Sequence, residues 1–288
     1  MAIVLGKPDV DELREVVHAL REWQRDGAPM QLHPGDLGWH WRFGAEATAA
    51  ALRTWHGNGQ IVAIGLVDGP ELLRLAIAPE AEHDRDLAWQ MVADVSDPRR
   101  GVLPAGSVDI EARSGVVFRG LLSADGWAAA EPWTPLHRDL SERVEDCGVR
   151  IEVTDAKRAH VRVAVQRAAF DKSTFTGDRW HAMATGLPYA DARCLVAYDE
   201  QATAVAAVTV WSAGPGRPGL LEPLGVHRGH RGHGFGRAVT VAAAAALRDL
   251  GSLSANVCTM SANTGAVATY TSAGFEPLPE VRDLHRSA

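Results

Sequence analysis

Residues 225–238, GVHRGHRGHGFGRA, hold three histidines, three arginines and five glycines, with no acidic residue among them. The stretch follows a short apolar run and precedes an alanine-rich one, so we expect it between a strand and a helix. The first N–H groups of a helix lack partners, and the helix dipole favours anions there. Glycines let a ligand approach the backbone closely. The stretch therefore predicts a site for a small polyanion such as a pyrophosphate.

Other readings of this stretch fit less well. Gly229 and Gly234 have the spacing of a Walker loop, but Phe235 stands where the lysine is needed. A dinucleotide fingerprint fails because Arg237 or Val239 falls at its third small position. The three histidines recur at i, i+3 and i+6, but glycines break the helix that would align them. No carboxylate or cysteine lies near in sequence to complete a zinc shell, so we expect no metal.

Two motifs together make a family resemblance. Residues 231–236 read RGHGFG, an R-x-x-G-x-G spacing, and residues 263–275 read NTGAVATYTSAGF, which has the pattern N-x-x-A-x-x-x-Y-x-x-x-G-F. In this order, with a strand between them, the motifs resemble those of the GNAT acetyltransferase superfamily. The resemblance covers roughly residues 150–280 and implies acetyl-CoA as cosubstrate. The residues that it implies for binding acetyl-CoA are Val226, Arg231, Gly232, His233, Gly234, Phe235, Gly236, Arg237, Asn263 and Ala266.

Three catalytic positions are expected in this half, two from the resemblance and one from its place on the strand. Pro223 suits a strand that bends away from its neighbour, since proline donates no ladder hydrogen bond. The N–H of Leu224 is then expected to donate to the acetyl carbonyl. Glu222 lies two residues earlier, on the same side if the strand stays regular, and is the candidate general base through a water molecule. Tyr270 matches the general acid of the family, which protonates the departing thiolate.

The chain resembles itself at a shift of about 148 residues. LLRLAI at 72–77 aligns with LEPLGV at 221–226, and SVDIEA at 107–112 aligns with SANVCT at 254–259. Gly-Trp at 126–127 likewise aligns with Gly-Phe at 274–275. We therefore expect an α/β fold, with a mixed sheet and flanking helices, in two tandem GNAT-like domains. The expected boundaries are residues 1–140 and 150–288, joined near residues 139–150.

The elements of the second half are expected from apolar periodicity, β-former content and glycine stops. Helices are expected over residues 164–170, 178–185, 236–250 and 263–272. Strands are expected over residues 193–198, 204–211, 219–226 and 254–260.

The first half lacks the chemistry of the second. The counterpart of the glycine loop, residues 78–88, has no glycine and four acids, which would repel a pyrophosphate. Leu122 and Gly115 stand at the positions of Tyr270 and Asn263. We expect a degenerate GNAT-like domain that binds no CoA at this place. It holds seven of the nine tryptophans, expected in the core or at a domain interface, with a few as possible walls of an acceptor pocket.

Composition limits the partners. The net charge of −7 disfavours nucleic acid, and no apolar run is long enough to span a membrane. Three cysteines without a CxxC pair and an N-terminus unlike a signal peptide suit the cytoplasm. The expected partners are acetyl-CoA and an amine acceptor, with the chain a monomer or homodimer.

The sequence favours an acetyl-CoA-dependent N-acetyltransferase that acts by direct transfer in a ternary complex. A mycothiol synthase-like enzyme, also tandem with an active second domain, and a non-catalytic acetyl-CoA sensor stay open. The acceptor is expected beside residues 170–189, where aromatics accompany Asp171 and Asp178, which would tolerate a cationic amine. The same composition equally suits an ordinary surface loop. Small molecule, peptide terminus and lysine side chain all stay open as acceptors.

Overall fold

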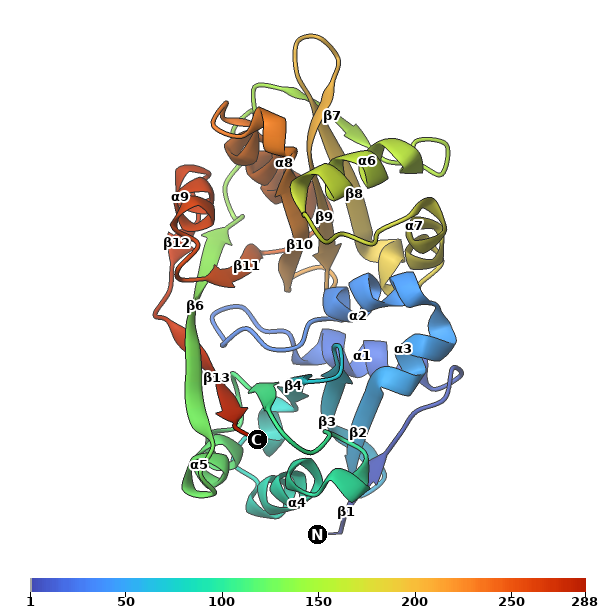
Figure 1. The fold of residues 1–288 in the computed structure, drawn as a ribbon, viewed down its shortest axis with the longest axis vertical. Coiled ribbons are helices and arrows are strands. Elements are labelled where there is room, and N and C mark those ends of the chain that lie inside the picture. Colours follow the sequence, from blue (N-terminus) through green and yellow to red (C-terminus); the bar gives the residue numbers. More distant parts are fainter. Residues whose placement is uncertain (1) are drawn as a thin grey trace. The chain divides into compact units, whose positions relative to one another are not determined.

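The computed structural model describes residues 2–288, shown in Figure 1. The chain forms two compact units. Unit 1 comprises the chain up to His33, Ala45–Trp133 and Glu280–Ala288, and unit 2 comprises Pro34–Gly44 and Thr134–Pro279. This division differs from the linear one at residues 1–140 and 150–288, because residues 34–44 pack with the second half and the C-terminal residues with the first.

Unit 1 is a mixed sheet with helices. Its strand order is β1-β2-β3-β4-β5-β13-β6, where β6 contributes residues 128–133. The strands are β1 (Ile3–Gly6), β2 (Leu52–Gly57), β3 (Gln60–Val67), β4 (Leu72–Ile77), β5 (Val108–Glu111), β6 (Ala128–Asp139) and β13 (Val281–Arg286). The helices are α1 (Leu13–Trp23), α3 (Ala45–Ala51), α4 (Arg85–Ser96) and α5 (Val116–Ala124), with short 3-10 turns at Pro79–Ala81 and Pro98–Arg100.

Unit 2 has a second mixed sheet, in the order β6-β11-β10-β9-β8-β7, with β12 also paired to β6. Its further strands are β7 (Arg150–Val153), β8 (Ala192–Tyr198), β9 (Ala204–Ser212), β10 (Pro218–Val226), β11 (Ser254–Met260) and β12 (Glu276–Pro277). Its helices are α2 (Pro34–His40), α6 (Ala159–Ala169), α7 (Gly177–Ala184), α8 (Phe235–Asp249) and α9 (Thr264–Ser272), with 3-10 turns at Trp41–Phe43, Leu187–Asp191 and Arg228–His230.

Helices cover both faces of the unit 2 sheet (Figure 1). Val208 and Val210 of β9 pack in one core cluster with residues of α8, whereas Ala207 packs in a second cluster with Val165 of α6. Because successive strand residues face opposite sides, α6 and α8 lie on opposite faces. The helices and strands expected in this half agree with the structure to within a few residues, except that α6 begins five residues earlier, at Ala159.

The internal repeat is confirmed by topology. In unit 1, β4 and β5 are parallel neighbours joined through α4, and α5 follows. In unit 2, β10 and β11 are parallel neighbours joined through α8, and α9 follows. No strand after Pro279 completes the described part of the unit 2 sheet. The position beside β11 is taken by β6, and the C-terminal strand β13 pairs in unit 1.

Candidate active site

The glycine-rich loop leads into α8 as the sequence predicts. Gly232 and Gly234 adopt positive φ angles of 81° and 82°, and a Cβ at either position would meet open space. Glycine is therefore required by the backbone conformation there and not by crowding. Gly234 is the N-cap of α8, and no side chain caps this helix end.

The loop leaves a run of unused hydrogen-bond donors. Within residues 2–288, the backbone N–H groups from Gly232 to Arg237 donate to no acceptor, and the first amide to return to the chain is that of Ala238, which donates to Gly234 O. Six consecutive free N–H groups at the start of a 15-residue helix form a cradle for an anion.

The loop arginines Arg231 and Arg237, which are expected among the residues that bind acetyl-CoA, donate to backbone carbonyls. Arg231 donates from Nη2 to the carbonyl of Ala169 at 2.8 Å, so it caps the end of α6. Arg237 donates from Nε to the carbonyl of Ser272 at 2.9 Å and pairs with Glu145 at 3.5 Å. Both guanidinium groups are held by helix C-termini, where the dipole attracts cations. These contacts fix both arginines beside the loop, and their part in binding acetyl-CoA stays a prediction.

Gly236 has a packing role. A Cβ at this position would come within 2.9 Å of Thr269 Cγ2 on α9 and 3.5 Å of Val226 Cγ2. The missing side chain lets the start of α8 lie directly against α9. Phe235 is half-buried against the core, and the rings of His230 and His233 lie 6.3 and 6.4 Å from its ring.

The loop histidines make ordinary local contacts. The Nδ1 of His227 accepts from Gly229 N, and that of His233 lies 2.9 Å from Arg231 O. In the part of the chain that the structure describes, no three His, Cys, Asp or Glu side chains gather as a metal site requires.

Strand β10 opens a gap beside β11. The two strands pair only from Pro218↔Ser254 to Leu220↔Asn256, while β10 continues to Val226. On the other side, His227 N donates to Val205 O of β9. Since N–H groups alternate in direction along a strand, the N–H of Leu224 points away from β9, toward the gap.

The bulge in β10 corrects the expectation for Glu222. Leu221 stands opposite Val210 and Leu224 opposite Val208, so β10 carries one extra residue between them. Alternation is broken there, and Leu221 and Leu224 share a face, against the core under α8. Glu222 therefore does not share the side of Leu224, as a regular strand would require. The Glu222–Pro223 peptide bond within the bulge is cis.

A buried tryptophan holds this bulge. The indole N–H of Trp211 on β9 donates to the backbone carbonyl of Glu222 at 2.6 Å. Helix α2 covers the indole, since a Cβ at Gly35 or Gly38 would come within 2.6 or 2.3 Å of Trp211 ring atoms. The ring of Tyr189 packs edge-on at 6.0 Å. Residues 34–44 thus complete the layer behind the site, which the linear domain division missed.

Tyr270 and Glu222 belong to one electrostatic environment. Tyr270 on α9 is 8% exposed, and burial, with the nearby negative charge of Glu222, raises its pKa to about 12. The hydroxyl is therefore protonated at neutral pH, as a proton donor must be. Asn263 is the N-cap of α9, accepting from Ala266 N at 3.2 Å, so it orders the helix that carries Tyr270.

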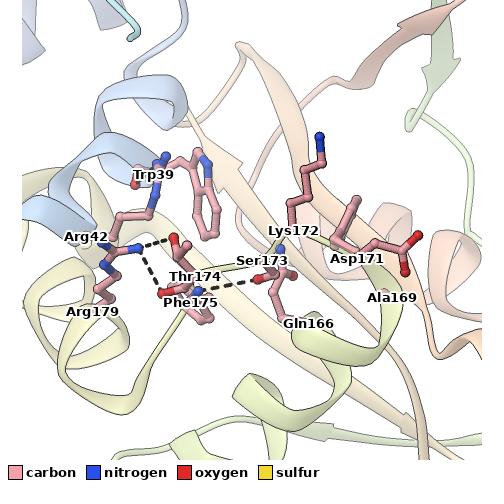
Figure 2. Close-up of a pocket in the computed structure, with 11 residues that line it drawn as sticks. Trp39, Arg42, Gln166, Ala169, Asp171, Lys172, Ser173, Thr174, Phe175 and Arg179 are labelled. Atoms are coloured by element: carbon pink, nitrogen blue, oxygen red, sulfur yellow. Dashed lines mark hydrogen bonds between the residues drawn. The ribbon is translucent and has the colours of Figure 1, made fainter.

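A cavity of about 560 Å³ lies beside these elements within unit 2 (Figure 2). Its wall includes Ala169 and Phe170, which also pack on β10, since a Cβ at Gly225 would lie 2.7 Å from Ala169 and 2.8 Å from the Phe170 ring. Residues 170–175 line it as expected for the acceptor region, but Trp39 and Arg42 line it too. The sequence predicted that a few tryptophans of the first half could line an acceptor pocket, and Trp39 does, whereas nothing in the sequence pointed to Arg42.

The charges around this cavity differ from those expected. The lining residues carry three cations, Arg42, Lys172 and Arg179, and one acid, Asp171. Asp178 is exposed and is not in the lining. Of the two acids that suggested a cationic acceptor, Asp171 is outnumbered by cations in the lining and Asp178 lies outside it.

Comparisons with known proteins agree with this architecture. Residues 164–275 match the Acetyltransferase (GNAT) family. A tandem GNAT protein from the clavulanic acid biosynthesis pathway is 14% identical with a TM-score of 0.60, and the match covers 99% of this chain and 98% of that one. A GCN5-related N-acetyltransferase from Sphaerobacter thermophilus is 15% identical with a TM-score of 0.58, over 99% and 95% of the two chains.

An acetyltransferase of the GNAT family from Colwellia psychrerythraea is 14% identical with a TM-score of 0.59, over 99% of each chain. At these identities the similarity shows the fold. No curated protein sequence matches the chain. No helix in residues 2–288 is long and apolar enough to cross a membrane. Residues 164–275 therefore match the Acetyltransferase (GNAT) family model, and the whole chain has the fold of tandem GNAT proteins.

Proposed function

We propose that the chain is an acetyl-CoA-dependent N-acetyltransferase with one working site, in unit 2. The observation that carries this proposal is the run of six unpartnered backbone N–H groups from Gly232 to Arg237, at the mouth of the gap between β10 and β11. The residues fit the pyrophosphate of acetyl-CoA, because free amides at a helix N-terminus bind phosphate oxygens and the open glycines leave room for them.

The gap beside β10 and the helix α9 suit the other end of acetyl-CoA, which carries the thioester. The gap that begins after Leu220↔Asn256 would hold the pantetheine arm, flanked by Val226 and by α9 with Asn263 and Ala266. The Leu224 N–H, directed into this gap, would donate to the acetyl carbonyl and stabilise the negative charge that develops on its oxygen. When bound, acetyl-CoA supplies the electrophilic carbon.

The protons are handled by Glu222 and Tyr270. An alkylammonium is protonated at neutral pH, so Glu222 would first accept one proton from it through a water molecule. The amine nitrogen then forms the new C–N bond while the C–S bond breaks. Tyr270, kept protonated by burial, would give its proton to the departing thiolate. The second proton lost from the nitrogen restores Tyr270, so that one proton in all leaves to solvent.

Unit 1 is proposed to bind no acetyl-CoA at the equivalent place. The start of α4, which corresponds to α8, is capped by Asp84, whose carboxylate accepts from Asp86 N and Leu87 N. Two of the N–H groups at this helix start are therefore already used, by a carboxylate that is negatively charged like the phosphate.

The test is CoA release from acetyl-CoA against a panel of primary amines. The Gly234→Asp variant serves as a disabled site, because an aspartate at this N-cap would occupy the helix N–H groups. Gly59→Asp is its matched control, since Gly59 has a φ of 80° and open space around it, in a hairpin of unit 1. Amine-dependent CoA release by the wild type and Gly59→Asp, but not by Gly234→Asp, supports the proposal. Binding of acetyl-CoA without amine-dependent release contradicts it and favours a sensor module.

A further inference from the structure

We propose that the acceptor is a small amine that carries a carboxylate, and that the cavity beside β10 binds this carboxylate through Arg42, Lys172 and Arg179. The inference rests on the proposed function and names its acceptor class. The cavity volume of about 560 Å³ is that of a small-molecule site, which favours a small acceptor over a protein side chain.

The balance of charge is the first argument. Three cations and one acid line the cavity, on a chain with a net charge of −7. The one acid, Asp171, is 87% exposed at its side chain and pairs at 3.0 Å with Arg228, which is outside the lining. In Figure 2 its carboxylate points away from Trp39, Arg42 and Arg179. The cavity therefore presents an excess of positive charge to a ligand.

The two arginines are fixed in position. Arg42 donates from Nη1 to Trp39 O at 2.7 Å, and Arg179 donates from Nη1 to Thr174 O at 2.8 Å. Both guanidinium groups pack on the ring of Phe43, at 4.3 and 5.1 Å from its centroid. Within the described residues, the Nε and Nη2 of Arg179 donate to no acceptor. Arg179 therefore keeps part of its planar fork for a carboxylate and loses little side-chain entropy on binding it.

A buried arginine behind the wall is the second argument. Arg162 on α6 is fully buried, and its Nε and Nη2 have no hydrogen-bond partner in residues 2–288. Its Nη1 donates to Gln166 Oε1 at 2.7 Å, and its guanidinium lies 5.7 Å from the Phe175 ring. Gln166 and Phe175 both line the cavity. An uncompensated buried cation one residue behind the wall adds a positive potential that a ligand carboxylate would offset.

The same contact orients Gln166. Because arginine only donates, the Gln166 oxygen must face Arg162, and its amide nitrogen is the part left to face other groups. This places two further N–H donors at the wall, and no lining side chain other than Asp171 is a carboxylate. The aromatic rings of Trp39, Phe170 and Phe175 would contact the apolar part of the acceptor.

The cavity lies next to the reacting edge. Ala169 lines the cavity, accepts from Arg231 of the glycine-rich loop and packs on Gly225, the residue after Leu224. A carboxylate bound at the arginines therefore leaves the other end of a short acceptor close to the strand that is proposed to hold the acetyl group.

The experiment compares each carboxylate with its own carboxamide. L-Phenylalanine, β-alanine and para-(aminomethyl)benzoate are assayed for CoA release beside their amides, with wild type, Arg179→Gln, Arg42→Gln and Asp171→Asn. We expect the carboxylates to be preferred. Each arginine variant should raise their KM by about 10- to 100-fold, the loss of one charge-assisted contact, and leave the KM of the amides and of acetyl-CoA unchanged. Asp171→Asn should lower the carboxylate KM slightly.

Direct binding separates this proposal from the proposed function. The same carboxylate and carboxamide pairs are titrated against tryptophan fluorescence, which needs no turnover. Carboxylate binding that weakens in Arg179→Gln supports the cavity as an anion site even if no amine releases CoA. Preference for the amides, in binding or in turnover, overturns the inference. A rise in the KM of acetyl-CoA in the arginine variants also overturns it, because the cations would then serve the phosphates of CoA.

Discussion

The indole N–H of Trp211 holds the carbonyl of Glu222 at 2.6 Å and thereby fixes the bulge in β10. The bulge sets the direction of the Leu224 N–H, so the tryptophan acts on the proposed oxyanion donor from the opposite strand. Trp211→Phe keeps an aromatic ring and removes this hydrogen bond. We expect kcat to fall by about 10- to 100-fold, since small misplacements of reacting groups have effects of this size.

Trp180→Phe is the matched control for that variant. Trp180 is equally buried, and its indole nitrogen has no hydrogen-bond partner in the described residues. Steady-state kinetics of the two variants therefore separate the hydrogen bond from the loss of ring volume. Equal losses of kcat in both variants would argue against a role for the bulge.

The contact between Gly236 and Thr269 predicts that packing and catalysis are linked. Gly236→Val places a branched side chain against α9, and we expect a loss of about 1–3 kcal/mol in the free energy of unfolding, with a lower kcat because α9 carries Tyr270. Gly120→Val, at an exposed glycine of α5 with open space around it, controls for helix propensity. Denaturant unfolding measures the difference, and equal stabilities of the two variants would contradict the contact.

The two units should differ in ligand binding. We expect isothermal titration to give one acetyl-CoA per chain, because the start of α8 has free N–H groups and the start of α4 is capped by Asp84. Gly234→Asp should remove this one site. A stoichiometry of two, or one site that persists in Gly234→Asp, would contradict the assignment to unit 2.

Asp283 predicts a pH dependence of stability in unit 1. Burial raises its pKa to about 6, and the nearby Arg113 only partly offsets this. Between the unfolded value of about 4 and the folded value of about 6, the folded state binds more protons, so this contribution to stability falls as the pH rises through that window. Asp283→Asn removes the titration. From pH 4 to 7 the free energy of unfolding of the wild type should therefore fall relative to that of Asp283→Asn. Parallel curves for the two proteins would contradict the shift.

Local patterns in the sequence predicted the second half well. The glycine loop, α8 and α9 follow from glycine stops, an alanine-rich run and the two motifs, all of which act over short distances. The internal repeat was visible because β4, β5 and α5 have apolar patterns that align with those of β10, β11 and α9. The strands of the second half are rich in apolar and β-branched residues, so their positions could also be predicted from the sequence.

Long-range relations could not be read in this way. Nothing local shows that residues 34–44 cover Trp211, or that Arg42 lines the same cavity as Lys172. The bulge at Glu222 could not be predicted from the sequence. Pro223 indicates an irregular strand, but it does not show to which face each neighbouring side chain turns. The charge of the loop arginines suggested a role in anion binding. The carbonyls to which they donate lie far away in sequence, as Ala169 does from Arg231, so these contacts could not be predicted.

The most direct test of the central claim is the kcat of Tyr270→Phe for amine-dependent CoA release. Because the raised pKa of about 12 keeps Tyr270 protonated through neutral pH, its loss should lower kcat by about 10²- to 10⁴-fold and leave the KM of acetyl-CoA little changed. Tyr198→Phe, another buried tyrosine of unit 2 that lies on β8, should keep the wild-type rate. A wild-type kcat in Tyr270→Phe would contradict the account.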